Sequence, residues 1–174
     1  MKILGFAASN NSQSINKQLV TYSTQLVEAE VEILDLNEYE MPIYSADREI
    51  ASGVPELAQA FFDKITNADA IVVSFAEYNG SYTSAFKNIF DWVSRIEQKL
   101  YQGKPMVLLS TSPGPGGAQS VLAGAVASSP FFAGDVKASL SVPSFFDNFD
   151  VKAGKISHPA LQQQLQDAMN TLTV

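Results

Sequence analysis

The chain has 174 residues, of which 46% are hydrophobic and 17% charged, a composition typical of a globular protein with one domain. Eighteen acidic against eleven basic residues give a net charge of −7, and no basic cluster could follow a phosphate backbone, which argues against nucleic acid binding. The lack of cysteine excludes disulfides, thiolate nucleophiles, iron–sulfur clusters and cysteine-ligated zinc, so redox chemistry would need a bound cofactor.

The first half of the chain reads as three strands and three helices. Residues 2–8 form an apolar run that superficially suggests a signal peptide. The polar Ser9-Asn10-Asn11-Ser12 that follows suits a turn into a helix, so we expect a buried strand and a cytoplasmic location. The apolar runs are too short to span a membrane. The remaining predictions are a helix striped by Ile15, Leu19, Tyr22 and Leu26, a strand at 31–36, a polar connection at 37–53, a helix from near Pro55 striped by Leu57, Phe61 and Ile65, a strand at 71–75, and a helix striped by Phe86, Ile89, Phe90 and Val93.

The second half continues the alternation. Residues 104–111 predict a fourth strand, residues 112–117 a loop, and residues 118–128 a helix. A fifth strand lies within 135–142, and a last helix from about Pro159 carries Leu161, Leu165, Ala168 and Leu172 on one stripe. Alternating strands and helices with short, right-handed connections predict an α/β fold. We expect one domain over residues 1–174, a doubly wound, five-stranded parallel sheet in the flavodoxin-like order 2-1-3-4-5.

Polar loops follow the first, third and fourth predicted strands, and in such a sheet these loops open at one edge. The first, Ser9 to Asn16, precedes a helix whose free backbone N–H groups and dipole favour an anion. Its serines could equally be plain helix caps, Ser12 or Ser14. The segment has neither a Walker A loop nor a Gly-x-Gly-x-x-Gly pattern.

The second and third loops also allow two interpretations. Glu77 to Ser84 could place backbone groups against a flat ring, with Gly80 allowing close approach, or Asn79-Gly80 could be a turn followed by a helix cap at Ser81, Thr83 or Ser84. Ser112 to Gly117 offers exposed N–H groups, although a Pro-Gly loop between a strand and a helix is commonplace. Three such loops in this order are stronger evidence for a ligand site than any one of them alone.

These loops resemble those of the NADPH-dependent FMN reductases, in the Glu-Tyr-Asn-Gly-Ser sequence from Glu77, the following Lys-Asn-x-x-Asp-Trp-x-Ser-Arg helix, and the Ser9, Ser14 and Asn16 pattern. The resemblance covers most of the chain through about Asp135 and implies a bound FMN. The implied phosphate contacts are Ser9, Asn11, Ser14, Ile15 and Asn16. The main chain of Glu77, Tyr78, Asn79 and Gly80 would grip the pyrimidine edge of the ring. The ribityl chain or the far side of the ring would meet Ser112, Pro113, Gly114, Gly116 and Gly117.

Asn11 stands where the family has an arginine associated with phosphate contacts and with the 2′-phosphate of NADPH. This leaves the choice between NADPH and NADH open. Ala8, Ala76, Thr83 and Ser84 are milder departures from the family pattern.

The resemblance implies an FMN-dependent NAD(P)H oxidoreductase. Hydride would pass from the nicotinamide to flavin N5, and electrons would then pass to free flavin, a quinone, an azo compound or a metal oxyanion. The flavin carries the chemistry, so no catalytic side chain and no metal are expected. Family members imply a homodimer or homotetramer. The alternatives are a flavodoxin-like electron carrier, which the acidity would suit, and a flavin-binding protein without NAD(P)H turnover.

Residues outside the three loops receive structural interpretations. His158 is expected to be a surface or capping residue, far from the loops. The stretch from Phe145 to Asp150 lacks the ligand spacing of an EF-hand, so we expect a loop packed by its phenylalanines. That cluster and Phe131-Phe132 could instead form a subunit contact.

Overall fold

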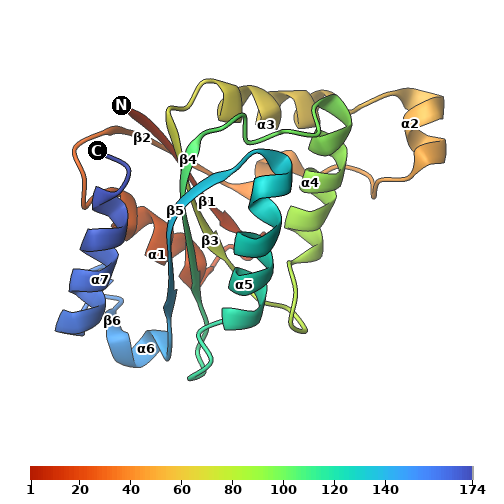
Figure 1. Ribbon diagram of the computed structural model, residues 1–174. Helices are drawn as coiled ribbons and strands as arrows, with labels where there is room; N and C mark the ends of the chain where they lie inside the picture. The colour runs from red at the N-terminus through yellow and green to blue at the C-terminus, as the bar shows by residue number, and fades with distance from the viewer. Residues whose placement is uncertain (174) are drawn as a thin grey trace.

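The computed structural model describes residues 1–173 and contains a parallel sheet of five strands at its centre (Figure 1). The strands are β1 (Lys2–Ala8), β2 (Glu30–Leu34), β3 (Ala70–Phe75), β4 (Pro105–Thr111) and β5 (Asp135–Val142). Their order in the sheet is β2-β1-β3-β4-β5, and every neighbouring pair is parallel. This confirms the predicted α/β fold and strand order. All five strands end at the same edge, where the loops that follow them meet.

Helices cover both faces of the sheet (Figure 1). One face carries α1 (Ile15–Thr24) and α7 (Pro159–Asn170). The other face carries α3 (Glu56–Thr66), α4 (Ser84–Ile96) and α5 (Gln119–Ser128). Short elements complete the chain: η1 (Leu36–Tyr39), α2 (Ala46–Ser52), η2 (Ser129–Phe132), α6 (Phe145–Asn148), β6 (Phe149–Asp150) and β7 (Lys155–Ile156).

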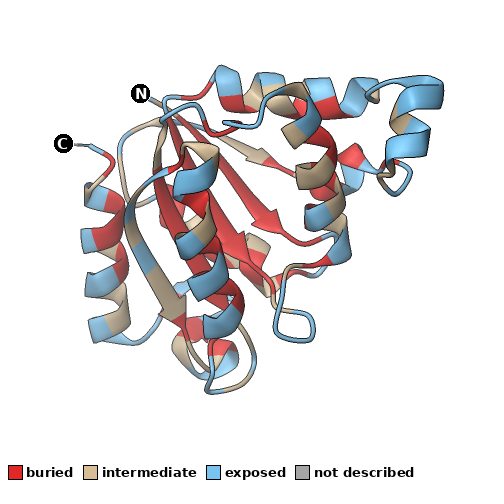
Figure 2. Cartoon of the chain, turned by 45° about the vertical axis from the view of Figure 1, so that its right-hand side comes forward, coloured by how far each residue is buried: buried red, intermediate tan, exposed pale blue. Residues whose placement is uncertain are grey.

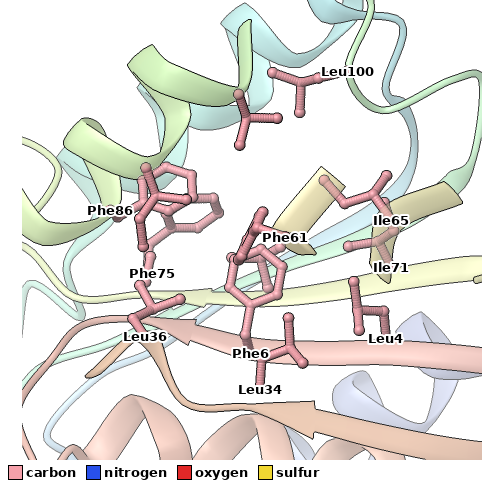
Figure 3. Close-up of a cluster of buried hydrophobic side chains, with 14 of the residues drawn as sticks. Leu4, Phe6, Leu34, Leu36, Phe61, Ile65, Ile71, Phe75, Phe86 and Leu100 are labelled. Carbon is pink, nitrogen blue, oxygen red and sulfur yellow. The ribbon is translucent and has the colours of Figure 1, made fainter. Parts of the chain in front are cut away.

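Burial follows this layering (Figure 2). Every residue of β3 is buried, as expected for a central strand covered on both faces. The edge strand β5 alternates between exposed and half-buried positions over most of its length, and its last residue, Val142, is buried. Successive strand residues serve opposite cores: Leu4 and Phe6 point to one face and Ile3 to the other. In the first core Phe6 meets Phe61 edge to face, with ring centroids 5.4 Å apart (Figure 3).

The predicted polar connection at 37–53 is wrong in part, because it contains η1 and α2. Ser45 caps α2 by accepting a hydrogen bond from the Arg48 N–H at 3.2 Å, and Gly53 ends the helix with φ of 73°. No residue of α2 is buried, and the helix projects from the body of the molecule (Figures 1 and 2). An apolar stripe could not predict it, because α2 packs no face against the core.

Three predicted helices differ from the structure in their bounds or in their buried stripe. Pro55 is the cap of α3 rather than its first residue, so the buried stripe is Ala58, Phe61 and Ile65, and Leu57 is 39% exposed. Helix α1 ends at Thr24 and α7 at Asn170, so Leu26 and Leu172 pack from the segments that follow the helices. Hydrophobic burial continues past each helix end, and spacing alone does not mark where the backbone leaves the helix.

The predicted loop from Phe145 to Asp150 is also wrong, because this segment forms the one-turn helix α6 and the strand β6. Strand β6 pairs with β7 in a small antiparallel sheet. Two of the phenylalanines do pack as expected: Phe145 and Phe149 are buried and stacked with ring centroids 4.6 Å apart. The third, Phe146, is 63% exposed. His158 lies exposed at the start of α7 without a capping bond from its side chain, which confirms the surface interpretation.

Candidate functional site

The loops after β1, β3 and β4 enclose one cavity of about 340 Å³ at the carboxyl edge of the sheet. Predicted site residues that line it are Ser9, Asn11, Ser14, Ile15, Asn16, Glu77, Tyr78, Ser112 and Pro113. Lining residues that the sequence did not single out are Gln13, Ala76, Thr111 and Phe146. The other predicted residues, Asn79, Gly80, Gly114, Gly116 and Gly117, lie in the same loops but outside this lining. Three segments far apart in the chain therefore build one concave site.

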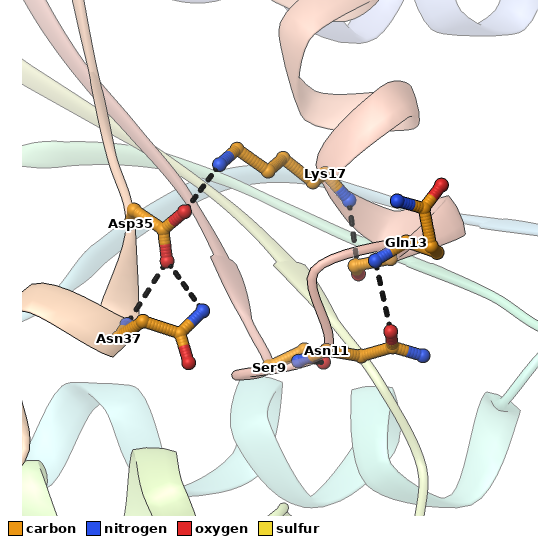
Figure 4. Close-up of polar contacts among 7 residues, drawn as sticks. Ser9, Asn11, Gln13, Lys17, Asp35 and Asn37 are labelled. Carbon is orange, nitrogen blue, oxygen red and sulfur yellow. Dashed lines mark hydrogen bonds and ion pairs between the residues drawn. The ribbon is translucent and has the colours of Figure 1, made fainter.

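The first loop is organised by its own side chains (Figure 4). Ser9 Oγ accepts a hydrogen bond from the Asn11 N–H at 3.1 Å, and Asn11 Oδ1 accepts one from the Gln13 N–H at 2.9 Å. Ser14 is the cap of α1, and its Oγ accepts from the Lys17 N–H at 3.2 Å. The capping interpretation is thus confirmed for Ser14. Capping by a serine is compatible with anion binding at the same helix end, because it satisfies only part of the free N–H groups.

The backbone N–H groups of Ile15 and Asn16 remain available. They are the first two residues of α1, and neither N–H donates a hydrogen bond to any residue of the described part of the chain. Both residues line the cavity. A helix N-terminus with free N–H groups and the positive end of the dipole is suited to a phosphate.

The Asn16 side chain has a different role from its backbone, because it lies in the interior and is 2% exposed. Its Oδ1 accepts hydrogen bonds from Ser74 Oγ at 2.7 Å and from the Thr111 N–H at 3.1 Å. Its Nδ2 donates to the Thr111 carbonyl at 3.2 Å. This one amide therefore joins the start of α1 to the ends of β3 and β4. Because the side chain of Asn16 is engaged in these bonds, Asn16 can contact a ligand in the cavity only through its backbone.

A charged pair holds the start of α1 against the end of β2 (Figure 4). Lys17 Nζ lies 2.6 Å from Asp35 Oδ2, and Asp35 Oδ1 accepts a hydrogen bond from the Asn37 N–H at 2.9 Å. The hydrogen bond from Lys17, followed by that from the Asn37 backbone, lowers the pKa of Asp35 to about 2. The pair with Asp35 holds the Lys17 side chain away from the cavity, and Lys17 is not one of the residues that line it.

Replacing Asp35 with asparagine is expected to cost about 1 kcal/mol or less of unfolding free energy at neutral pH, because both side chains are partly exposed. The folded pKa lies below the ordinary value of 3.8, so the stabilisation is present above about pH 4 and is lost as the pH falls toward 2. Urea unfolding of wild type and Asp35→Asn across this range measures the effect. A difference in unfolding free energy between wild type and Asp35→Asn that stays constant down to pH 2 would contradict this prediction. Lys17→Met removes the other partner and should show the same pH dependence as Asp35→Asn.

The second loop is a tight hairpin turn. Tyr78 and Ser81 exchange backbone hydrogen bonds of 3.0 and 3.2 Å, and Asn79 and Gly80 between them have φ of 54° and 77°. The turn interpretation of Asn79-Gly80 is confirmed, and Thr83 caps α4 by accepting from the Phe86 N–H. A Cβ built on Gly80 would meet nothing within 4 Å, so this backbone faces open space. Tyr78 is 49% exposed beside the cavity.

Glu77 links the second loop to α5. Its Oε2 accepts a hydrogen bond of 2.8 Å from the Val121 N–H in the first turn of that helix. The residue before α5, Ala118, has φ of 60° and offers no side-chain cap. Glu77 therefore supplies the missing cap from 44 residues away, and its negative charge lies at the positive end of the helix dipole. The sequence gives no local signal for this contact.

The third loop is fixed by its neighbours. The Gly117 carbonyl accepts hydrogen bonds from Ser110 Oγ at 2.7 Å and Ser141 Oγ at 2.8 Å. Gly117 has φ of 59°, and a Cβ there would collide with Ser141 and lie 3.2 Å from the Pro143 backbone, so only glycine fits. The pattern of three glycines thus reflects packing at Gly117, while a Cβ on Gly114 or Gly116 would meet nothing within 4 Å.

The charge of the cavity is unusual for a site that could take a phosphate. None of the residues that line it is Lys, Arg or His, and its carboxylate, Glu77, is engaged with α5. Asn11, at the family's arginine position, has turned its amide oxygen to its own loop. An anion here would depend on backbone N–H groups and the dipole of α1.

A second hollow, of about 230 Å³, adjoins the first loop at Asn10. It is bordered by Asn10, by the segment from Leu36 to Met41, and by the first turns of α4 with Ser84 and Asn88. Of the loop residues predicted to bind a cofactor, none borders this hollow.

Among residues 1–173, no helix has the length and apolar character needed to cross a membrane.

Comparison with known proteins agrees with the fold and the loop pattern. The family model of the NADPH-dependent FMN reductases matches residues 1–144. A 2-hydroxy-1,4-benzoquinone reductase of a Burkholderia species is 35% identical over 131 residues, covering 73% of this chain and 70% of the relative. A NAD(P)H-dependent FMN reductase of Pseudomonas aeruginosa is 33% identical over 116 residues, covering 66% and 61%. A quinone reductase of Escherichia coli is 28% identical over 115 residues, with the same coverages. The chain thus spans between 61% and 70% of these relatives' own lengths.

Solved structures share the architecture. A flavoenzyme NAD(P)H:(acceptor) oxidoreductase from Paracoccus denitrificans superposes with a TM-score of 0.76 at 23% identity, covering 98% of this chain and 94% of the other. An azoreductase from Bacillus anthracis gives a TM-score of 0.63 at 17% identity and full coverage of both chains. At these identities the structures support the fold, while the family match carries the identification. The chain therefore belongs to the NADPH-dependent FMN reductase family and is an oxidoreductase that works with FMN and a reduced nicotinamide nucleotide.

Proposed function

We propose that the cavity formed by the three loops holds the FMN. The observation that carries this proposal is the convergence of all three loops on one cavity. Its residues fit the phosphate: Ile15 and Asn16 present free N–H groups at the start of α1, and Ser9 and Ser14 fix the loop around them. Because no cationic side chain lines the cavity, the phosphate is held by backbone donors and the helix dipole.

The ring is assigned to the second and third loops. The backbone from Glu77 to Gly80 binds its pyrimidine edge, and the open space at Gly80 allows that approach. The third loop, with Ser112, Pro113, Gly114, Gly116 and Gly117, borders the ribityl chain or the far side of the ring. The contact from Glu77 to α5 and the bonds to Gly117 keep both loops in place before binding, which reduces the entropic cost of holding the cofactor.

Bound FMN supplies the chemistry, which is hydride acceptance from the nicotinamide and electron transfer to a second substrate. The chain holds and orients the reactants, and hydride transfer to the flavin requires no acid or base from the protein. Tyr78, half-exposed beside the cavity, offers an aromatic surface for a flat substrate. Backbone donors of the second loop near the ring would favour negative charge that develops on it.

A quinone is the acceptor that we propose first, because two of the relatives are named as quinone reductases. Free flavin, azo compounds and metal oxyanions are the other candidates.

We also propose that residues 1–174 act as one FMN-binding domain within a homodimer or homotetramer, and that the protein works in the cytoplasm, where its reductant is produced. Size-exclusion chromatography with light scattering and cell fractionation test the last two points.

Anaerobic titration of the FMN-loaded protein tests the proposal. Addition of NADPH or NADH is expected to bleach the flavin absorbance, and a benzoquinone should then restore it. Both nucleotides must be tried, because no cation in the cavity lining would favour the 2′-phosphate. A flavin spectrum that survives both nucleotides would favour an electron carrier. A chain that takes up no FMN would contradict both functions.

A further inference from the structure

One aromatic side chain of the cavity comes from outside the segment that the family model matches. That match ends at residue 144, and Phe146 lies in α6 beyond it. Phe146 is 63% exposed and packs into neither hydrophobic core, yet it lines the cavity beside Tyr78 and Pro113. Burial of the ring in this chain alone therefore does not account for a phenylalanine at this position.

The position of Phe146 is fixed by its neighbours. The Ser144 N–H donates to the Gly114 carbonyl at 2.9 Å, and the Phe145 N–H donates to the Ser112 carbonyl at 3.0 Å, which fastens α6 to the third loop. Phe145 is fully buried and stacks on Phe149, so it anchors the turn in the core. The Phe146 ring meets the Phe145 ring edge to face at 5.4 Å. An exposed ring on an anchored turn can receive a ligand with little loss of conformational freedom.

We propose that Phe146 is an aromatic wall of the flavin site that packs against the isoalloxazine ring. The inference rests on the function proposed above. Tyr78 and Phe146 are the aromatic side chains among the cavity-lining residues, and they come from different loops. A flat heterocycle gains from contact with aromatic faces and edges, a gain that does not depend on the phosphate at the other end of the cofactor.

Calorimetric titration of the flavin-free chain with FMN and with riboflavin tests this inference. Phe146→Ala is expected to weaken the binding of both flavins by about ten-fold. Phe146→Tyr, which keeps the ring, should bind both within about two-fold of wild type. Phe131→Ala is the matched control, because Phe131 is 77% exposed and does not line the cavity, and it should bind like wild type.

The outcomes distinguish a failure of the proposed function from a failure of the role proposed for Phe146. If wild type binds neither flavin, the proposed function fails, and this inference fails with it. If wild type binds FMN but Phe146→Ala binds both flavins equally well, only the role of Phe146 is overturned, and a raised KM for a benzoquinone would then assign the ring to the acceptor. Weakening for FMN alone would also overturn it, because it would place Phe146 at the phosphate. A thermal midpoint of Phe146→Ala equal to that of wild type excludes a folding defect as the cause.

Discussion

Asn16→Ala is expected to lower the free energy of unfolding by about 3 kcal/mol or more. The substitution removes three hydrogen bonds at once and leaves the Thr111 N–H, the Thr111 carbonyl and the Ser74 hydroxyl without their partner in the interior. Each buried polar group left unpaired costs roughly 1–3 kcal/mol. Urea unfolding followed by far-UV circular dichroism measures the change.

Asn11→Ala is the matched control for that substitution. Asn11 lies in the same loop but is exposed, and its side chain makes one local hydrogen bond to the Gln13 N–H, so we expect a loss of about 1 kcal/mol or less. Equal losses for the two variants would contradict the assignment of Asn16 as the junction of α1, β3 and β4. Asn16→Asp should be at least as damaging as alanine, because it buries a charge and removes the donor to the Thr111 carbonyl.

Ile15→Pro is expected to weaken FMN binding by roughly 10- to 100-fold while leaving α1 intact. Proline is well tolerated at the first position of a helix, where its missing N–H has no partner in the helix. Ser14, which precedes it, has an extended backbone with ψ of 121°, the conformation that a residue before proline favours. The substitution thus deletes one free N–H from the cavity, and a hydrogen bond to a charged group contributes about 1.5–3 kcal/mol.

Two controls isolate the contact between the Ile15 N–H and the phosphate. Ile15→Ala removes the same side chain but keeps the N–H, so the effect of proline is judged against Ile15→Ala by calorimetric titration. Riboflavin lacks the phosphate, so both variants should bind it with equal affinity. If Ile15→Pro and Ile15→Ala bind FMN equally, or if riboflavin is weakened as strongly as FMN, the phosphate does not lie at the start of α1.

The sheet could be predicted from the sequence because its central strands are nearly continuous apolar runs. The run from Ile71 to Phe75 has no alternation, which is the pattern of a strand covered on both faces, and β3 is buried throughout. Helix α2 could not be predicted in this way. It buries no residue and depends on a capping serine and a terminal glycine, which are local features without an apolar stripe.

The candidate site could also be predicted only in part. The loops after β1, β3 and β4 could be predicted as neighbours, because parallel strands bring their carboxyl ends to one edge. The role of Asn16 could not, since its partners Ser74 and Thr111 lie 58 and 95 residues away. The same holds for the Glu77 bond to Val121. Phe146 reaches the cavity only because α6 turns it outward and Phe145 inward, a choice that the pair of adjacent phenylalanines leaves undetermined.

Hydrogen–deuterium exchange with and without FMN tests the central claim that the three loops form one flavin site. We expect FMN to slow exchange in three separate segments together, residues 9–16, 77–80 and 112–117, with the largest effect at the free amides of Ile15 and Asn16. Exchange at α2, which is remote from the cavity, should not change. Protection confined to the second hollow, around Asn10, Tyr39 and Ser84, or no protection in the three loops while FMN is bound, would contradict the account.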